Sequence, residues 1–318
     1  MSNGRKTITT FAPAKINFFL EVLSRRDDGY HNLRSIVMPV SVYDLIEIEL
    51  REGKNLLFDY SEKSTIPLEE LQVARNGDNL AVKAAKEFLR ETGISKGFRI
   101  RLEKHIPVGS GMGGGSADAA AVLHCLNMLC NAGFDIEKLR MIGAKLGSDI
   151  PALTHGGAAL IEGKGEIVTP LNIAKESGEN KRWWLVILYP HFHVSTKDIY
   201  SRHTLSLTHD DEKYKRIICS VEKGDIRGAV GNLKNDLQET VFRKYPVIKI
   251  ILEKMREAGA LDAMVSGSGS SVFGLANDKQ HAEDVAERLR KVFGMSIWLR
   301  VAHTLPDGVM AAHGPLEA

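Results

Sequence analysis

Apolar and polar residues alternate near the start of the chain, from Ile16 to Val22, and Lys15 stands at the entrance of this stretch. A period of two is typical of a strand with one face against the core. The polar run RRDDGYHN at positions 25–32 ends the alternation. The same period recurs over 44–50 and 98–103, so this part of the chain predicts half-buried antiparallel strands.

Helical periodicity first appears over 80–89, and Gly93 just beyond it supplies a residue that commonly ends a helix. A glycine-dense loop over 109–115 runs directly into a second helical pattern, for which Ser116 is the expected N-cap. A further helix is expected over 135–146, and the segment GGAALIEGKGEIV at 156–168 has the glycine-bounded form of a hairpin.

The second half mixes strands and helices without strict alternation. We expect strands at 183–190 and 297–301, helices at 211–220, 223–237, 247–257 and 281–292, and two strands joined by a Gly/Ser turn within 263–276. This order favours an α+β class over a doubly wound sheet. The polar segment 174–182 follows the hairpin, so we place the domain boundary between the hairpin and this segment and expect one domain over 1–170 and a second over 171–318.

Composition excludes several classes of partner. The chain of 318 residues carries 42 basic and 40 acidic residues spread along its length, which gives no field of one sign for nucleic acid or an anionic membrane. No apolar run is long enough to span a bilayer, and the N-terminus lacks the pattern of a signal peptide. The three cysteines form no CxxC pair. We therefore expect a cytoplasmic protein with reduced thiols and a small-molecule partner.

The glycine loop is the strongest chemical signal. Glycines let the backbone approach a ligand closely, and the amides at the start of the following helix attract an anion, so we expect a phosphate chain here. A flexible linker is a poor alternative, because the loop lies between a strand and a helix. The pattern GxGxxG at 109–114 also fits dinucleotide-binding proteins, but no strand-ending acid follows at the required distance, and no GK is followed by Ser or Thr as in a P-loop.

The loop sequence PVGSGMGGGSADAA resembles the phosphate-binding motif of the GHMP kinase superfamily. Seven motifs occur in the order seen in the family of 4-diphosphocytidyl-2-C-methyl-D-erythritol kinases: APAKINFFLEV, DDGYHNL, DNLAVKAA, the glycine loop, LGSDIPALTHGGAALIEGKGE, NDL and VSGSGSSVFGL. The resemblance implies a two-domain fold with a ribosomal-protein-S5-like N-terminal domain and a ferredoxin-like C-terminal domain, the active site lying between them. It also implies ATP and Mg²⁺ as cofactors and phosphorylation of the 2-hydroxyl of a cytidine diphosphate-linked methylerythritol, in isoprenoid precursor biosynthesis.

The resemblance assigns roles to individual residues. Asp149 would orient the attacking hydroxyl, and Lys15 would stabilise charge on the transferring phosphoryl group. The nucleotide would contact Asn79, Pro107, Val108, Gly109, Ser110, Gly111, Met112, Gly113, Gly114, Gly115 and Ser116. The acceptor would contact Asn17, Tyr30, His31, Thr196 and Tyr200. Ser110, Met112 and Ala117 depart from the family pattern, and the missing hydroxyl at Ala117 leaves Ser116 as the hydroxyl for phosphate or the metal.

Each of these residues also has a structural alternative at this stage. Asp149 could cap a helix or pair with a charge, Asn79 could cap the helix that follows it, and Tyr200 could pack in the core. Two rival functions also remain: another kinase of the superfamily, of the homoserine or mevalonate type, and a non-catalytic RNA-binding module. The sequence leaves open whether the protein is a monomer or a homodimer, and which residues hold the metal.

Overall fold

A computed structural model describes residues 6–72, 79–176, 179–180, 182–206 and 208–308. Within them, a seven-stranded sheet has the order β10-β1-β2-β4-β3, with β5 and β6 attached beside β2. Its strands are β1 (Thr7–Arg25), β2 (His31–Arg51), β3 (Leu56–Tyr60), β4 (Gly97–Glu103), β5 (Ala159–Gly163), β6 (Ile167–Pro170) and β10 (Lys234–Asn235). The antiparallel pairing of β1 with β2 and of β2 with β4 confirms the antiparallel strands expected from the alternation.

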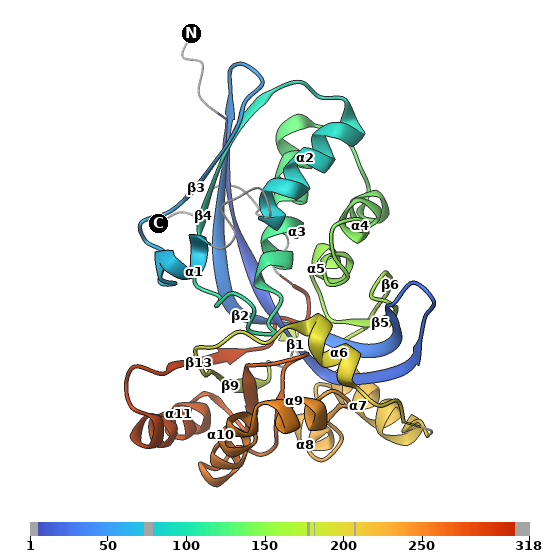
Figure 1. Cartoon of the computed structure of the whole chain (residues 1–318), viewed down its shortest axis with the longest axis vertical. Coiled ribbons are helices and arrows are strands. Elements are labelled where there is room, and N and C mark those ends of the chain that lie inside the picture. The colour runs from blue at the N-terminus through green and yellow to red at the C-terminus, as the bar shows by residue number, and fades with distance from the viewer. Residues whose placement is uncertain (1–5, 73–78, 177–178, 181, 207, 309–318) are drawn as a thin grey trace.

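Helices of the N-terminal half lie against this sheet (Figure 1). They are α1 (Leu68–Gln72), α2 (Leu80–Thr92), α3 (Gly114–Cys130), α4 (Ile136–Ala144) and α5 (Ile150–His155). Phe88 of α2 and Val122 of α3 pack with Phe98 and Ile100 of β4 in one buried cluster. The core therefore forms where the apolar face of each predicted helix meets the apolar face of the predicted strands.

A second sheet, with the order β11-β12-β9-β13, organises the C-terminal half. The elements here are β9 (Trp184–Tyr189), β11 (Ala263–Val265), β12 (Val272–Ala276), β13 (Trp298–His303), α6 (Thr196–Arg202), α7 (Asp211–Lys223), α8 (Ile226–Ala229), α9 (Gln238–Lys244), α10 (Pro246–Glu257) and α11 (Lys279–Phe293). A small separate ladder joins β7 (Lys175–Glu176) to β8 (Glu179–Asn180). Residues 177–178 and 181 of the polar segment lie outside the described residues, and the domain division at 170/171, just before that segment, stays a prediction.

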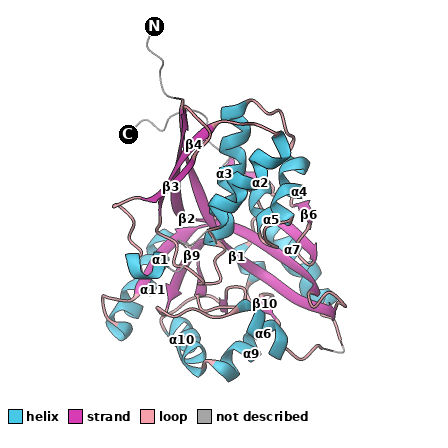
Figure 2. Cartoon of the chain, turned by 45° about the horizontal axis from the view of Figure 1, so that its top comes forward, coloured by secondary structure: helices cyan, strands magenta, loops and turns pink. Residues whose placement is uncertain are grey.

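Strand β9 is buried on both faces. Val186 and Leu188 pack in the cluster that contains α10 and α11, whereas Leu185 and Ile187 pack in the cluster that contains Phe18 of β1. An uninterrupted apolar run is what a strand between two layers requires. The C-terminal sheet consequently lies between its own helices and the long strands β1 and β2, which extend into the lower half of the molecule in both views (Figures 1 and 2).

The expectation that β1 is half-buried is wrong. Asn17, Phe19 and Glu21, on the supposedly exposed side, are all buried. Glu21 is buried because Arg34 of β2 lies 2.6 Å from its carboxylate, and Lys234 of β10 also pairs with it. Tertiary charge pairing thus allows a glutamate to occupy an interior position that its sequence pattern assigns to solvent.

Two further expectations are wrong. No single helix spans 223–237: α7 ends at Lys223 with Gly224 as its left-handed C-cap (φ 64°), and the short helix α8 and the strand β10 follow within the expected range. The α3 helix begins at Gly114 with Gly113 as its N-cap, not at Ser116, because the glycine loop turns directly into the helix without a side-chain cap. The hairpin of β5 and β6, the Gly/Ser turn between β11 and β12, and helices α2, α4, α7, α10 and α11 are confirmed.

None of the helices in the described part of the chain combines the length and the apolarity that a bilayer crossing requires.

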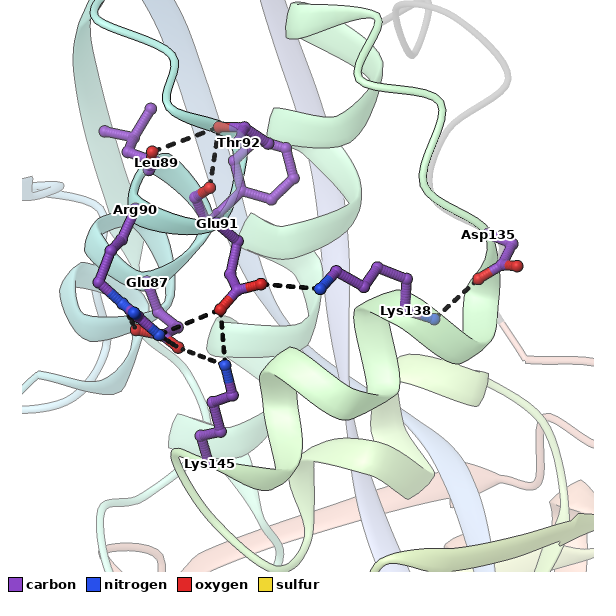
Figure 3. A network of polar contacts seen from close by, with 9 residues as sticks. Glu87, Leu89, Arg90, Glu91, Thr92, Asp135, Lys138 and Lys145 are labelled. Atoms are coloured by element: carbon purple, nitrogen blue, oxygen red, sulfur yellow. Dashed lines mark hydrogen bonds and ion pairs between the residues drawn. The ribbon is translucent and has the colours of Figure 1, made fainter.

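A charge network fastens α2 to α4 (Figure 3). The Glu91 carboxylate forms ion pairs with Lys138 at 2.7 Å and with Lys145 at 2.6 Å. The Glu87 carboxylate pairs with the same Lys145 at 3.0 Å and with Arg90 at 2.6 Å. These hydrogen bonds lower the pKa of Glu87 and of Glu91 to about 2. Two carboxylates that share one lysine therefore act as a clamp between the two helices.

This clamp should weaken in acid. Because the folded-state pKa values are depressed, the clamp stabilises fully above about pH 4.3, the unfolded value for glutamate, and its contribution is lost as the pH falls towards about 2. We expect Glu91→Gln to lower the urea midpoint at pH 6 and to differ little from wild type at pH 2.5. Glu257→Gln, which removes an exposed carboxylate from its ion pair with Lys254, is the control. An equal deficit for Glu91→Gln at both pH values would contradict the assignment.

Candidate active site

A cavity of about 1130 Å³ lies between the glycine loop, the start of β1 and the segment that leads into α6. It is lined by residues of both halves of the chain. From the predicted site these are Lys15, Asn17, Tyr30, His31, Asn79, Pro107, Val108, Gly109, Ser110, Gly111, Gly113, Gly114, Gly115, Ser116, Asp149, Thr196 and Tyr200. Met112 is the predicted contact that does not line it, because its side chain is fully buried in the core.

The glycine loop is held from both sides. The Ser110 hydroxyl donates to the Pro107 carbonyl at 2.8 Å, and the Ser110 backbone carbonyl accepts the Ser271 N–H at 3.0 Å. The Ser266 hydroxyl donates to the Gly111 carbonyl at 3.1 Å. The Gly/Ser turn between β11 and β12 therefore packs beside the loop and fixes it in front of the N-terminus of the 17-residue helix α3. Free amides and the helix dipole make this position attractive to an anion.

Lys15 and Asp149 meet at the centre of the cavity, with the ammonium 3.4 Å from the carboxylate. Lys15 is only 4% exposed, and the register of β1 against β2 shifts between Pro13 and Lys15, directly before it. Asp149 occupies the N-cap position of α5, but its side chain makes no capping hydrogen bond. The capping alternative for Asp149 is therefore excluded, whereas the charge-pair alternative is realised with Lys15.

A short polar chain orients the Lys15 ammonium. It donates to Asn17 Oδ1 at 2.8 Å, Asn17 Nδ2 donates to the Ser35 hydroxyl at 2.8 Å, and Ser35 donates to the Phe19 carbonyl at 2.6 Å. All three side chains are buried. Asn17 thus has both of its amide groups occupied, which fixes the amide orientation and holds the ammonium towards the cavity.

Aromatic rings gather at the other end of the cavity. The rings of His31 and Tyr200 are 5.3 Å apart and tilted by 37°, and Tyr30 is 53% exposed beside them. Burial, and then the charge of Arg25, lowers the pKa of His31, so its ring is kept neutral. Tyr200 also packs against the C-terminal core. Its side chain therefore both belongs to the core, as the structural alternative expected, and lines the cavity. An exposed ring next to a neutral imidazole is a suitable surface for a planar ligand.

Two predicted residues have polar partners as well as a place in the lining. Asn79 caps α2 by accepting the Ala81 N–H at 2.8 Å, and its amide donates to the Tyr60 hydroxyl at 3.0 Å. Thr196, the first residue of α6, shares a hydrogen bond of 2.8 Å with Ser268. The capping alternative for Asn79 is therefore correct without removing it from the cavity.

Comparison with known proteins places this geometry in a family. The GHMP kinases N terminal domain model matches residues 79–157, and the GHMP kinases C terminal model matches residues 220–294. A 4-diphosphocytidyl-2-C-methyl-D-erythritol kinase of Clostridium perfringens is 40% identical over 88% of this chain and 92% of its own length. The kinase of the same name from Thermodesulfovibrio yellowstonii is 38% identical over 94% of this chain and 99% of its own length. The chain belongs to the GHMP kinase family.

A solved structure agrees with this assignment. The crystal structure of a 4-(cytidine 5'-diphospho)-2C-methyl-D-erythritol kinase superposes with a TM-score of 0.76 at 32% identity, covering 93% of this chain and 99% of that one. The α+β GHMP kinase fold predicted from the motifs is thereby confirmed. The glycine loop and helix α3 fall within the first matched segment, so the cavity of this GHMP kinase contains the most characteristic part of its family.

Sequence reasoning missed a buried charge cluster behind the loop of this GHMP kinase. Lys104 and Asp118 both line the cavity and lie 2.9 Å apart, and Asp44 also pairs with Lys104. Burial raises the pKa of Asp118 well above its usual range, whereas the two carboxylates outweigh burial and raise the pKa of Lys104. The available signal was Asp118 itself, a single carboxylate within the apolar segment ADAAAVL.

A substitution at Gly111 tests how closely the Gly/Ser turn between β11 and β12 packs against the glycine loop. Gly111 has φ +82°, and a Cβ there would overlap the Ser266 carbonyl and lie 2.7 Å from that of Gly269. Gly133 has φ +70° with nothing within 4 Å of its Cβ position, so it is the matched control. We expect Gly133→Ala to cost about 1 kcal/mol in the free energy of unfolding from backbone strain alone. Gly111→Ala should lower the free energy of unfolding, measured by urea denaturation, clearly more than Gly133→Ala does. Equal losses in the two variants would contradict close packing of the Gly/Ser turn against the loop.

Proposed function

We propose that this GHMP kinase transfers the γ-phosphate of ATP to the 2-hydroxyl of 4-diphosphocytidyl-2-C-methyl-D-erythritol. The observation that carries the proposal is that one cavity holds a glycine loop at a helix N-terminus, a lysine–aspartate pair and a group of aromatic rings. These three parts match a triphosphate, a reacting hydroxyl and a planar base. The relatives that share more than a third of their residues with this chain carry the name of this kinase.

On the nucleotide side, the glycine loop and Ser116 hold the phosphates, and Asn79 contributes to the adenine pocket. The loop presents backbone N–H groups without side chains that would keep a phosphate away, and α3 adds the positive end of its dipole. Asn79 is only 9% exposed and already tied to Tyr60, so it offers the base a rigid polar edge. The phosphate oxygens would thus be hydrogen-bonded mainly by backbone N–H groups.

The transfer step needs little covalent chemistry from the protein. Phosphoryl transfer passes through a loose transition state in which the acceptor hydroxyl loses its proton late. Asp149 accepts that proton or orients the hydroxyl, and Lys15 stabilises the charge on the transferring phosphoryl group. Lys15 can do this because its ammonium is already desolvated and held by Asn17, so little reorganisation is needed during the reaction.

On the acceptor side, Tyr30 and Tyr200 offer ring faces to the cytosine, and His31 offers a neutral edge that can exchange hydrogen bonds with it. Thr196 and Asn17 also line the cavity, and we assign the methylerythritol and diphosphate portions to them. A homoserine or mevalonate acceptor would not use a ring surface of this kind. The aromatic end of the cavity is therefore the feature that favours the cytidyl acceptor.

Mg²⁺ would enter with the ATP phosphates. The described residues contain no group of three or more His, Cys, Asp or Glu side chains that could hold a metal ion by themselves. Magnesium in nucleotide enzymes is held largely by substrate phosphates and few protein groups, and the cavity offers the Ser116 hydroxyl for that purpose. The bound metal would supply charge neutralisation between the phosphates, and the protein residues would orient the phosphate chain around it.

The remaining features of the proposal concern the whole protein. We assign the segments 1–170 and 171–318 to two domains with the active site in the cleft between them, because the cavity lining draws on both segments. Cys125, Cys130 and Cys219 are free, which fits a reducing cytoplasm. Nothing in this reaction needs a second subunit, so either a monomer or a homodimer would serve it.

The first experiment measures ADP release with Mg²⁺-ATP and 4-diphosphocytidyl-2-C-methyl-D-erythritol, beside homoserine, mevalonate and galactose. We expect turnover with the cytidyl acceptor alone. Since stacking on a base is worth about 1–3 kcal/mol, Tyr30→Leu should raise the KM for this acceptor about 5- to 100-fold and leave the KM for ATP unchanged. Turnover with a different acceptor, insensitive to Tyr30→Leu, would discard the cytosine site while retaining a kinase.

Asp149→Asn keeps the shape of the side chain and removes its charge. We expect kcat to fall at least about 100-fold, the low end for a positioned acid or base, with nucleotide binding largely retained. Asp27→Asn, an exposed carboxylate in the turn after β1 that does not line the cavity, serves as the control and should leave kcat unchanged. Near-normal turnover of Asp149→Asn would remove Asp149 from the mechanism.

A further inference from the structure

The imidazole of His193 lies directly against the glycine loop. A Cβ placed on Gly109 would overlap the His193 ring and come 2.6 Å from its Nε2 atom, so the ring occupies the space that a side chain at 109 would fill. His193 also lines the cavity. It comes from the segment between β9 and α6, in the C-terminal half, whereas Gly109 belongs to the N-terminal half. The ring therefore covers the phosphate loop from the opposite side of the cavity.

The His193 ring has no polar partner among the residues that the structure describes. Within the described residues, His193 makes no hydrogen bond or ion pair, so both ring nitrogens remain available. His191, two positions earlier, is the contrast. Its Nε2 lies 3.1 Å from the Ser296 carbonyl and 3.1 Å from the Trp298 N–H, and it does not line the cavity. The same short segment thus contains one histidine used for structure and one directed at the loop.

The surroundings of His193 are suited to an anion. Lys197, the second residue of α6 and four positions after His193, also lines the cavity and has no ion pair within the described part of the chain. The loop beneath the ring carries no side chain at Gly109, and Ser110 next to it has its hydroxyl committed to the Pro107 carbonyl. The loop itself therefore offers backbone N–H groups, and the ring above it offers a further N–H. Phosphate oxygens are strong acceptors for both kinds of donor.

We propose that His193 is a phosphate-binding residue of the nucleotide site, which donates a ring N–H to an oxygen of the ATP phosphate chain where that chain passes Gly109. The inference rests on the proposed function for the presence of ATP in the cavity, but not on the identity of the acceptor. A phosphate bound by the backbone N–H groups of the loop and by the His193 ring would touch both halves of the chain. Nucleotide binding would then tie the two halves together across the cavity.

Calorimetric titration of adenosine, AMP, ADP and ATP into wild-type protein, His193→Ala, His193→Gln and His191→Ala tests the proposal. Because one net hydrogen bond is lost, we expect His193→Ala to weaken ADP and ATP binding about three- to tenfold and to leave adenosine binding unchanged. His193→Gln keeps a donor of similar reach and should recover most of the affinity. His191→Ala should leave the difference between ATP and adenosine as in wild type.

The outcomes separate this inference from the proposed function. Equal losses for adenosine and ATP would mean that His193 supports the loop or the base, and unchanged ATP binding in His193→Ala would mean that it contacts nothing; either result overturns the proposal. Wild-type protein that binds ATP but does not phosphorylate the cytidyl acceptor would contradict the proposed acceptor and leave the His193 comparison readable. A wild-type protein that binds no nucleotide would overturn both.

Discussion

The burial of the Lys15 ammonium is the constraint on which the rest of the site depends. A lysine that is 4% exposed must have its ammonium satisfied, and Asn17 and Asp149 are the partners of that group. The backbone N–H of the same residue donates to the Met112 carbonyl in the glycine loop at 2.9 Å. Lys15 therefore joins the phosphate loop, through its backbone, to the acidic residue that the transfer reaction needs, through its charge.

A second buried charge joins the two halves of the chain away from the cavity. Glu21 accepts the Asp210 N–H at 3.0 Å and pairs with Arg34 and with Lys234, so β1, β2, β10 and the start of α7 share one carboxylate. Apolar packing continues this connection, since Phe18 of β1 and Leu185 of β9 lie in the same buried cluster. The walls of the cavity are therefore held at a defined separation by polar and apolar contacts together.

Most of the elements followed from local pattern, since a period of two or a helical period needs no knowledge of distant residues. The exceptions have tertiary causes. The burial of Asn17 and Glu21 depends on partners contributed by Ser35 and Lys234, which no alternation around residue 20 can reveal. The helix expected over 223–237 did not form as one element, because Gly224 ends α7 in the left-handed conformation. The apolar residues of that segment alone had suggested a continuous helix. The motifs were stronger signals than the periodicity, because seven short segments in a fixed order specify a family even where each one is weak.

By itself, the sequence determined the glycine loop before a helix, the α+β class and the family, because these are carried by residue types in order along the chain. Only the tertiary structure decided which residues meet. It placed Asp149 opposite Lys15, moved the Met112 side chain into the core, added Lys104 and Asp118 to the cavity and laid His193 on Gly109. The physical reason is that these contacts join residues far apart in sequence, and their burial and pairing depend on how the two sheets pack.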